Sequence, residues 1–243
     1  MAVKKSVLEQ ARAATSSARA AAGQLQEATE DLTPRLAKLH TAVIHDVMRQ
    51  MDLKDFTLPH TLRQVTVAKS IAGPVFTVRG KVTPKAAAHD TLLAWTGFLS
   101  KAKAGHVVVI EANDDEVAHM GELSGEALMH KGVRGVVIDG GARDVEFLMG
   151  MGFPVYARYA TPRDITGYWT IEALDVPIKI GKAKIAPHDY LLADRDGIVI
   201  LPRERAAAIV NAAAVAMGTE NQIRTAILSG LDPQEAYLKY GKF

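Results

Sequence analysis

The chain has 243 residues, of which 48% are hydrophobic, so it can bury the core of one large domain or two small ones. Its 29 Lys/Arg and 27 Asp/Glu residues leave a net charge of +2, and no Lys/Arg run exceeds two residues, so we expect neither a nucleic-acid nor a membrane surface. The absence of cysteine excludes disulfides, thiolate metal sites and cysteine nucleophiles. No apolar stretch approaches the roughly 18 residues of a membrane span, and no secretory signal is recognised, so a cytoplasmic protein is expected.

The N-terminal part of the chain predicts helices. Residues 5–32 are rich in alanine and contain no proline, which favours a helix. The first 24 residues hold four Lys/Arg and one acid, a bias that a transit peptide shares, but a helix packed on the body or on a neighbour is favoured. A second helix is expected at residues 35–51, where apolar residues recur near helical spacing. We therefore predict an N-terminal helical extension, residues 1–35, and one α/β domain, residues 36–243.

From residue 64 onward, short β-branched runs alternate with helical patterns. The expected strands are residues 64–68, 75–80, 106–112, 135–139, 154–159, 176–181 and 197–202. The expected helices are residues 89–102, 123–132, 145–152 and 203–230. Strands that alternate with helices are typical of an α/β domain with some parallel pairing.

The stretch GVRGVVIDGGARDVEFL, residues 132–148, places Arg143 and Asp144 together where a strand meets a Gly-rich turn. Arginine offers a planar fork for a carboxylate, and aspartate is a hard oxygen ligand for Mg²⁺, so the pair can grip a small oxo-acid. The alternative is structural, with Arg143 capping the strand and Asp144 capping the next helix. No dinucleotide fingerprint, phosphate-binding loop or GxSxG elbow is present to suggest other chemistry.

A second motif lies upstream of this pair. In the Gly121–Glu122–Leu123 turn, Glu122 precedes Arg143 by a gap of 20 residues, and FPV (153–155) and HDYLLADRDGIVILP (188–202) follow. In these motifs the sequence resembles the RraA-like family, over roughly residues 36–240. That family includes class II pyruvate aldolases acting on 4-hydroxy-4-methyl-2-oxoglutarate and 4-carboxy-4-hydroxy-2-oxoadipate, and also a regulator of ribonuclease activity that is not an enzyme in that role. The resemblance implies a compact, swivelling β/β/α-type sandwich that assembles as a trimer or hexamer.

The resemblance also implies roles for the two motifs. Asp144 would bind a divalent metal, Mg²⁺ or Mn²⁺, and Arg143 would bind the carboxylate or keto oxygen of a small 2-oxo acid. The Gly121 turn and the backbone N–H groups of Leu123 and Ser124, at a helix start, would bind the substrate carboxylate.

Two glutamates complete the implied site. Glu122 would hold metal-bound water that serves as the base, although the aldolases usually carry aspartate there and glutamate reaches one methylene further. Glu220 is the best match to a glutamate that a neighbouring subunit's C-terminal helix contributes in this family. We expect an interruption of the helical pattern at Gly218–Thr219 to turn Glu220 toward that neighbour; the alternative is an intrachain cap or an ion pair with Arg224.

Together these parts imply a metal-dependent lyase that cleaves a 4-hydroxy-2-oxo acid to release pyruvate, or that decarboxylates oxaloacetate. The rival interpretation is a non-catalytic binding protein like the ribonuclease regulator, which needs neither Glu220 nor a metal. The acidic segment at residues 111–119 is interpreted as a loop near the pocket rather than a metal cluster, because its spacing matches no familiar site. Tyr168 and Trp169 are interpreted as packing or subunit-contact residues rather than pocket lining.

Overall fold

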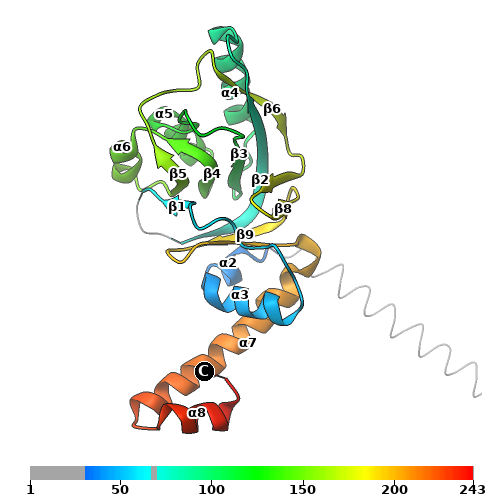
Figure 1. Ribbon diagram of the computed structural model, residues 1–243, viewed down its shortest axis with the longest axis vertical. Helices are drawn as coiled ribbons and strands as arrows, with labels where there is room; N and C mark the ends of the chain where they lie inside the picture. Colours follow the sequence, from blue (N-terminus) through cyan, green and yellow to red (C-terminus); the bar gives the residue numbers. More distant parts are fainter. Residues whose placement is uncertain (1–30, 67–69, 243) are drawn as a thin grey trace, which may run out of the picture. The chain divides into compact units, whose positions relative to one another are not determined.

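A computed structural model of the chain describes residues 31–66 and 70–242 (Figure 1). Residues 33–243 form one compact unit. The helical extension predicted for residues 1–35 lies almost entirely outside the described residues, and it stays a prediction.

Helices and strands alternate through the middle of the described chain, as the sequence predicts. The helices are α2 (Thr33–Leu36), α3 (Thr41–Gln50), α4 (Ala88–Lys101), α5 (Glu122–His130), α6 (Val145–Gly150), α7 (Arg203–Leu228) and α8 (Pro233–Tyr240). The strands are β1 (Arg63–Gln64), β2 (Ile71–Val82), β3 (Val107–Glu111), β4 (Gly135–Ala142), β5 (Val155–Ala160), β6 (Trp169–Leu174), β7 (Ile178–Ile180), β8 (Ala183–Ile185), β9 (Tyr190–Ala193) and β10 (Ile198–Leu201). The α/β class is confirmed, but the sequence did not predict β6, β8 or α8, and β6 to β10 follow one another without an intervening helix.

The main sheet joins a parallel part to an antiparallel part. Its strand order is β1-β5-β4-β3-β2-β9-β10, with β6 paired to β2 beside this path. Strands β2, β3, β4 and β5 are parallel, whereas β9 runs antiparallel to the first part of β2 and to β10. The 12 residues of β2 make it long enough to pair with β9 at its start and with β3 and β6 further on. Parallel strands of this kind are normally buried on both faces.

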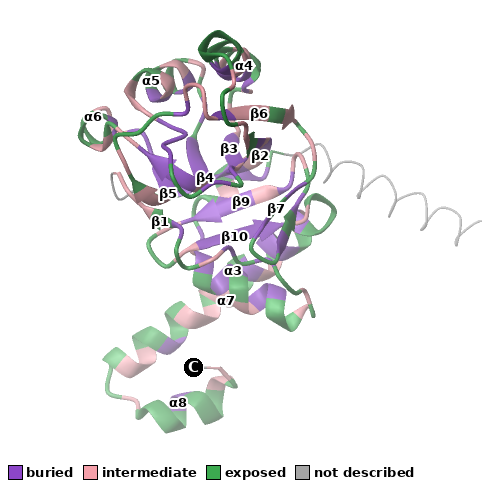
Figure 2. Cartoon of the chain, turned by 45° about the horizontal axis from the view of Figure 1, so that its top comes forward, coloured by how far each residue is buried: buried purple, intermediate pink, exposed green. Residues whose placement is uncertain are grey.

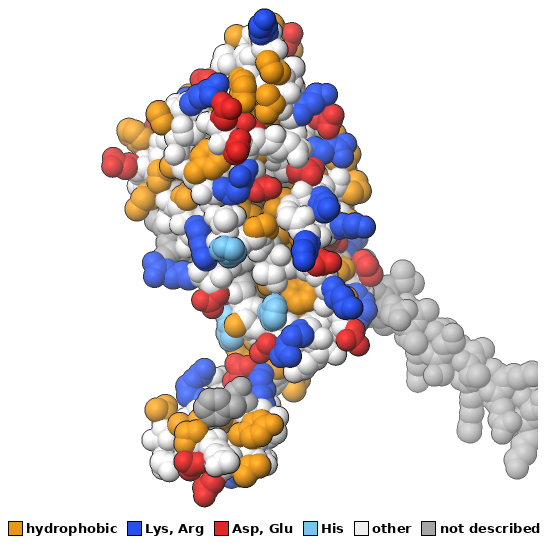
Figure 3. Space-filling view, viewed as in Figure 1, with side chains coloured by type: hydrophobic (Ala, Val, Ile, Leu, Met, Phe, Trp, Pro, Cys, Tyr) orange, Lys and Arg blue, Asp and Glu red, His pale blue; other side chains and the backbone are white. Residues whose placement is uncertain are grey.

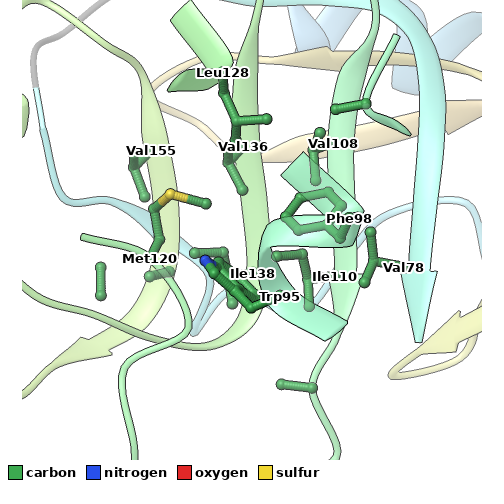
Figure 4. Packing of buried hydrophobic residues seen from close by; sticks show 14 of the residues in the cluster. Val78, Trp95, Phe98, Val108, Ile110, Met120, Leu128, Val136, Ile138 and Val155 are labelled. Atoms are coloured by element: carbon green, nitrogen blue, oxygen red, sulfur yellow. The ribbon is translucent and has the colours of Figure 1, made fainter. Parts of the chain in front are cut away.

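Each face of the parallel strands carries its own hydrophobic core. On one face lie α4, α5 and α6. Trp95 and Phe98 of α4 and Leu128 of α5 belong to the same core as Ile138 of β4 (Figure 4). On the other, Val109 and Val137 belong to a core shared with the β7–β8 and β9–β10 hairpins. Complete burial of such side chains stabilises a fold by about 1.5–3 kcal/mol each. Figure 2 shows these strands buried between elements with exposed outer surfaces, which confirms the predicted β/β/α layering.

The helices at the two ends of the domain differ from the predicted ones. The helix expected at residues 35–51 is two helices, because His40 has extended dihedrals and caps α3 by accepting the N–H of Val43 through Nδ1 at 3.3 Å. The interruption expected at Gly218–Thr219 is wrong, since α7 continues through it. A single glycine costs a helix only about 1 kcal/mol, and the Thr219 hydroxyl bonds back to the Val215 carbonyl instead of breaking the helix.

On the face seen in Figure 3, basic and acidic side chains are interspersed rather than separated by sign. Within residues 31–66 and 70–242, no helix combines the length and the apolar character that a membrane crossing requires.

Candidate active site

Strand β4 carries the Arg143–Asp144 pair to the carboxyl edge of the parallel strands, where open α/β sheets commonly bind ligands. Gly140 and Gly141 lie within this strand and not in the turn that the sequence suggested. Both positions exclude a side chain: a Cβ on Gly140 would lie 2.6 Å from His119 Nδ1, and one on Gly141 would collide with the Tyr159 ring. The glycines therefore let the end of β4 pack against two rings.

Asp144 connects β4 to α6 in the left-handed conformation, with φ 52° and ψ 37°, which aspartate tolerates better than most residues. It occupies the N-cap position of α6, yet its side chain makes no cap hydrogen bond. Instead, Oδ2 accepts the backbone N–H of Glu122 at 3.1 Å. The structure thus rejects the helix-cap alternative and directs the Asp144 carboxylate to the Gly-acid-Leu turn.

Gly121 fits this turn because there is no room for a side chain. A Cβ here would lie 2.6 Å from Asp144 Oδ2 and 3.1 Å from Arg143 Cγ. The neighbouring Met120 fixes the turn from both sides, since its side chain is 2% exposed in the core (Figure 4) and its carbonyl accepts the Arg143 N–H at 2.8 Å. The Gly121–Glu122–Leu123 turn and the Arg143–Asp144 pair are therefore in contact.

Arg143 lies between two carboxylates. Its Nε is 3.5 Å from Asp144 Oδ2, and its Nη1 is 3.5 Å from Asp164 Oδ2. Both separations exceed a normal hydrogen bond, and the side chain is 39% exposed, so the guanidinium retains donors for an incoming anion.

Asp164 is a site residue that the sequence reasoning missed. It lies in the loop after β5, which is held to β4 by the Thr161 N–H bonded to the Ala142 carbonyl at 3.0 Å. The available signal was its position just beyond the strand next to β4, because adjacent parallel strands end at the same edge of the sheet.

The first turn of α5 faces the same region. The Ser124 hydroxyl accepts the Trp95 indole N–H at 2.9 Å, which ties this turn to α4, whereas the Leu123 side chain is 78% exposed. The first N–H groups of a helix have no intrahelical partners and favour anions. The predicted contact of these two backbone N–H groups with a carboxylate stays a prediction.

Glu220 lies elsewhere in the chain. Its carboxylate pairs with Lys242 Nζ at 2.7 Å and lies 3.8 Å from His40 Nε2. Arg224, the alternative partner, instead donates to Asn221. Glu220 thus belongs to the helical part of α3, α7 and α8, away from the β4–α6 junction (Figure 1). One chain does not bring Glu220 to its own Arg143–Asp144 pair.

Asp144 suits a hard divalent cation such as Mg²⁺. Its side chain is 38% exposed, and within the described residues no group hydrogen-bonds to Oδ1. Mg²⁺ characteristically keeps several waters and binds one or two carboxylates together with substrate oxygens. No group of three His, Asp or Glu side chains that could hold a metal ion occurs in the described part of the chain.

Comparison with known proteins places this architecture in a family. The chain is 32% identical over 105 residues to a 4-hydroxy-4-methyl-2-oxoglutarate aldolase of Thermus thermophilus, covering 43% of this chain and 63% of that protein. It is 24% identical over 213 residues to protein DlpA of Legionella pneumophila, covering 86% of this chain but only 34% of DlpA.

The fold is also similar to that of a solved structure. The crystal structure of Streptomyces coelicolor RraAS2, described as an unusual member of the RNase ES inhibitor RraA protein family, superposes with a TM-score of 0.73 at 23% identity, covering 80% of this chain and 96% of that one. The RraA-like family model, described as Aldolase/RraA, matches residues 41–200. That match spans more than half of the sequence, and the chain therefore belongs to the RraA-like family.

Proposed function

We propose that the chain is a metal-dependent lyase that releases pyruvate from a 4-hydroxy-2-oxo acid and that decarboxylates oxaloacetate by the same enolate chemistry. The observation that carries this proposal is the hydrogen bond between the Glu122 N–H and Asp144 Oδ2, with Arg143 beside it. It places a free carboxylate oxygen, a guanidinium and a helix N-terminus at one edge of the sheet. Membership of a family with a named aldolase supports the same chemistry.

The chain's own groups account for substrate binding. The substrate is an anion, and the Arg143 guanidinium can donate two parallel hydrogen bonds to its carboxylate or keto oxygen. The N–H groups of Leu123 and Ser124 add partial positive charge at the start of α5. Asp144 would hold Mg²⁺ or Mn²⁺, which supplies Lewis-acid stabilisation of negative charge on the substrate oxygens.

Cleavage then follows from where charge develops. When the C3–C4 bond breaks, its electron pair forms the enolate of pyruvate, and the Arg143 guanidinium stabilises the new oxyanion. The C4 hydroxyl becomes a carbonyl as it loses its proton to water held by Glu122 and by Glu220 of a second copy of the chain. Protonation of the enolate at C3 yields pyruvate. In oxaloacetate, the same enolate forms when C3 loses CO₂.

The direct test measures pyruvate formed from 4-hydroxy-4-methyl-2-oxoglutarate and from oxaloacetate, with added Mg²⁺ or Mn²⁺ and with EDTA. We expect release above the spontaneous rate that EDTA removes and that excess metal restores. Release that is equal with and without EDTA would contradict the metal requirement. No release from any branched 2-oxo acid would favour a non-catalytic binding protein.

We also propose that the active site is completed in a homo-oligomer, a trimer or hexamer. Large apolar side chains are exposed on the C-terminal helices and beside the site: Val215, Leu228, Tyr237, Leu238, Leu123 and Phe147, each more than half exposed. Figure 3 shows hydrophobic side chains at the surface of the α8 region. Contact between these two surfaces in different copies would bury both sets and would bring Glu220 to a neighbour's Asp144.

Mixing two inactive variants tests this arrangement. Glu220→Gln and Asp144→Asn subunits should each be inactive alone, but reassembled together they should regain activity above both parents. The reason is that some sites then pair an intact Asp144 with an intact Glu220 from another chain. Mass spectrometry checks that mixed oligomers have formed. Mixed oligomers that stay inactive would place Glu220 outside a shared site.

A further inference from the structure

The acidic loop between β3 and α5 contains a buried aspartate–histidine pair, Asp114 and His119, that the proposed chemistry does not use. Asp114 and His119 have side chains that are 1% and 0% exposed, and His119 Nε2 lies 3.3 Å from Asp114 Oδ2. The segment is a loop near the site, as its interpretation from sequence expected. Neither Asp114 Oδ1 nor His119 Nε2 has a well-aligned hydrogen-bond partner in the described chain. Burying such atoms is costly, so their retention calls for an explanation.

The surroundings of His119 define its chemical state. Its Nδ1 accepts the Gly141 N–H at 3.4 Å, so in the neutral ring the proton lies on Nε2, the nitrogen that is 3.3 Å from Asp114 Oδ2. Burial is the main cause that lowers the pKa of His119 to about 4; the carboxylate of Asp114 acts in the opposite direction. The Trp169 ring, at a centroid distance of 4.7 Å, excludes water from the edge of the imidazole. A fully buried group of this kind cannot touch substrate.

Asp114 organises the first half of the loop. Its Oδ2 accepts the backbone N–H groups of Glu116 at 3.2 Å and Val117 at 2.9 Å. The Tyr159 hydroxyl lies 3.5 Å from the same oxygen, and Arg158 donates to the Asp114 carbonyl. A single buried carboxylate therefore ties the loop to β5 and to itself.

His119 organises the second half of the loop. Its backbone N–H donates to the Gly141 carbonyl at 2.8 Å, and Ala118 forms a parallel bridge with the same residue of β4. The next residues are the Gly121–Glu122 turn, whose N–H meets Asp144. The route from the buried pair to the candidate metal ligand is thus short: the backbone from His119 to Glu122 and then one hydrogen bond to Asp144.

We propose that Asp114 and His119 are positioning residues that lock loop 112–121 onto β4 and thereby hold the Glu122 N–H against the Asp144 carboxylate. The consequence for catalysis rests on the proposed function, whereas the consequence for the loop does not. Losing the pair should free the loop, misorient Asp144 and weaken metal binding and turnover. Groups that orient a metal-ligand side chain typically account for about 10–100-fold in metal affinity or activity.

The test uses the full chain with His119→Phe, which keeps a ring against Trp169 but removes both nitrogen contacts, and with His119→Gln, whose amide can still donate toward Asp114. Thr77→Val is the matched control, because Thr77 is another fully buried polar residue and the change removes its hydrogen bond to the Val176 carbonyl, at 2.6 Å, on the other face of the sheet. Hydrogen exchange of residues 112–122, Mn²⁺ affinity by electron paramagnetic resonance, and kcat and KM are measured for each.

For His119→Phe we expect faster exchange across residues 112–122, Mn²⁺ binding weaker by about tenfold and a loss of about 10–100-fold that falls mainly on kcat. His119→Gln should recover part of each loss, and Thr77→Val should show none of them. If His119→Phe does not fold, Asp114→Asn, which preserves size, takes its place with the same expectations. Unchanged exchange and unchanged Mn²⁺ affinity in a folded variant would overturn the proposal. A wild-type protein without lyase activity would contradict only the proposed function, because hydrogen exchange would still show whether the pair holds the loop in place.

Discussion

Asp144→Asn is expected to abolish metal-dependent pyruvate release while leaving the fold intact. The amide oxygen can still accept the Glu122 N–H, and asparagine tolerates the left-handed conformation at φ 52°, so neither contact nor backbone changes. What disappears is the negative charge that holds a divalent cation. Losing Lewis-acid stabilisation of several kcal/mol lowers the rate by about 10²–10³-fold or more. The measurements are kcat/KM at saturating Mg²⁺ and Mn²⁺ affinity.

Asp175→Asn is a closely matched control. Asp175 also follows a strand, has φ 57° and forms an exposed ion pair, with Lys103 at 2.7 Å, but it takes no part in the candidate site. Exposed pairs of this kind contribute about 0–1 kcal/mol, so this variant should keep wild-type activity. Wild-type activity of Asp144→Asn at ordinary Mg²⁺ would disprove the metal assignment.

Arg143→Lys is expected to lose most of the activity although the charge is conserved. A lysine ammonium cannot reproduce the planar fork that binds a carboxylate or enolate with two parallel hydrogen bonds. Removing one such contact to a transition state costs about 2.7–4 kcal/mol, which is about 10²–10³ in rate. The loss is measured by steady-state kinetics on whichever substrate releases pyruvate in the metal-dependence assay.

Arg79→Lys serves as the control because Arg79 is 38% exposed, close to the 39% of Arg143, and likewise pairs with a carboxylate, Glu172, at 3.0 Å. Its replacement should leave kcat/KM unchanged. If Arg143→Lys behaves in the same way, Arg143 has only a structural role beside Asp144 and Asp164.

The tertiary structure decided questions that local patterns left open. Residues 143–150 predict both a capped helix and a ligand site, and only the approach of α5 shows that Asp144 bonds across to Glu122. Asp164 follows a different strand and enters the site because β4 and β5 are neighbours. Nothing local reveals such pairings, since they depend on which strands lie side by side.

Much of the fold, in contrast, was readable in the sequence. Apolar runs of strand length alternate with helical patterns, and burial of those side chains is the dominant favourable contribution to the folding free energy. The hydrophobic pattern therefore predicts the α/β class and which elements are buried. The same patterns misplaced two helix boundaries, the break after α2 and the interruption of α7 that does not occur, because a cap or one glycine shifts the free energy by only about 1 kcal/mol. The candidate ligand and arginine were visible as neighbours in sequence, at 143 and 144. Long-range packing decides the rest: the orientation of these two side chains, the buried Asp114–His119 pair, and the distance of Glu220 from its own chain's site. That packing depends on strand order and loop contacts, which local sequence does not encode.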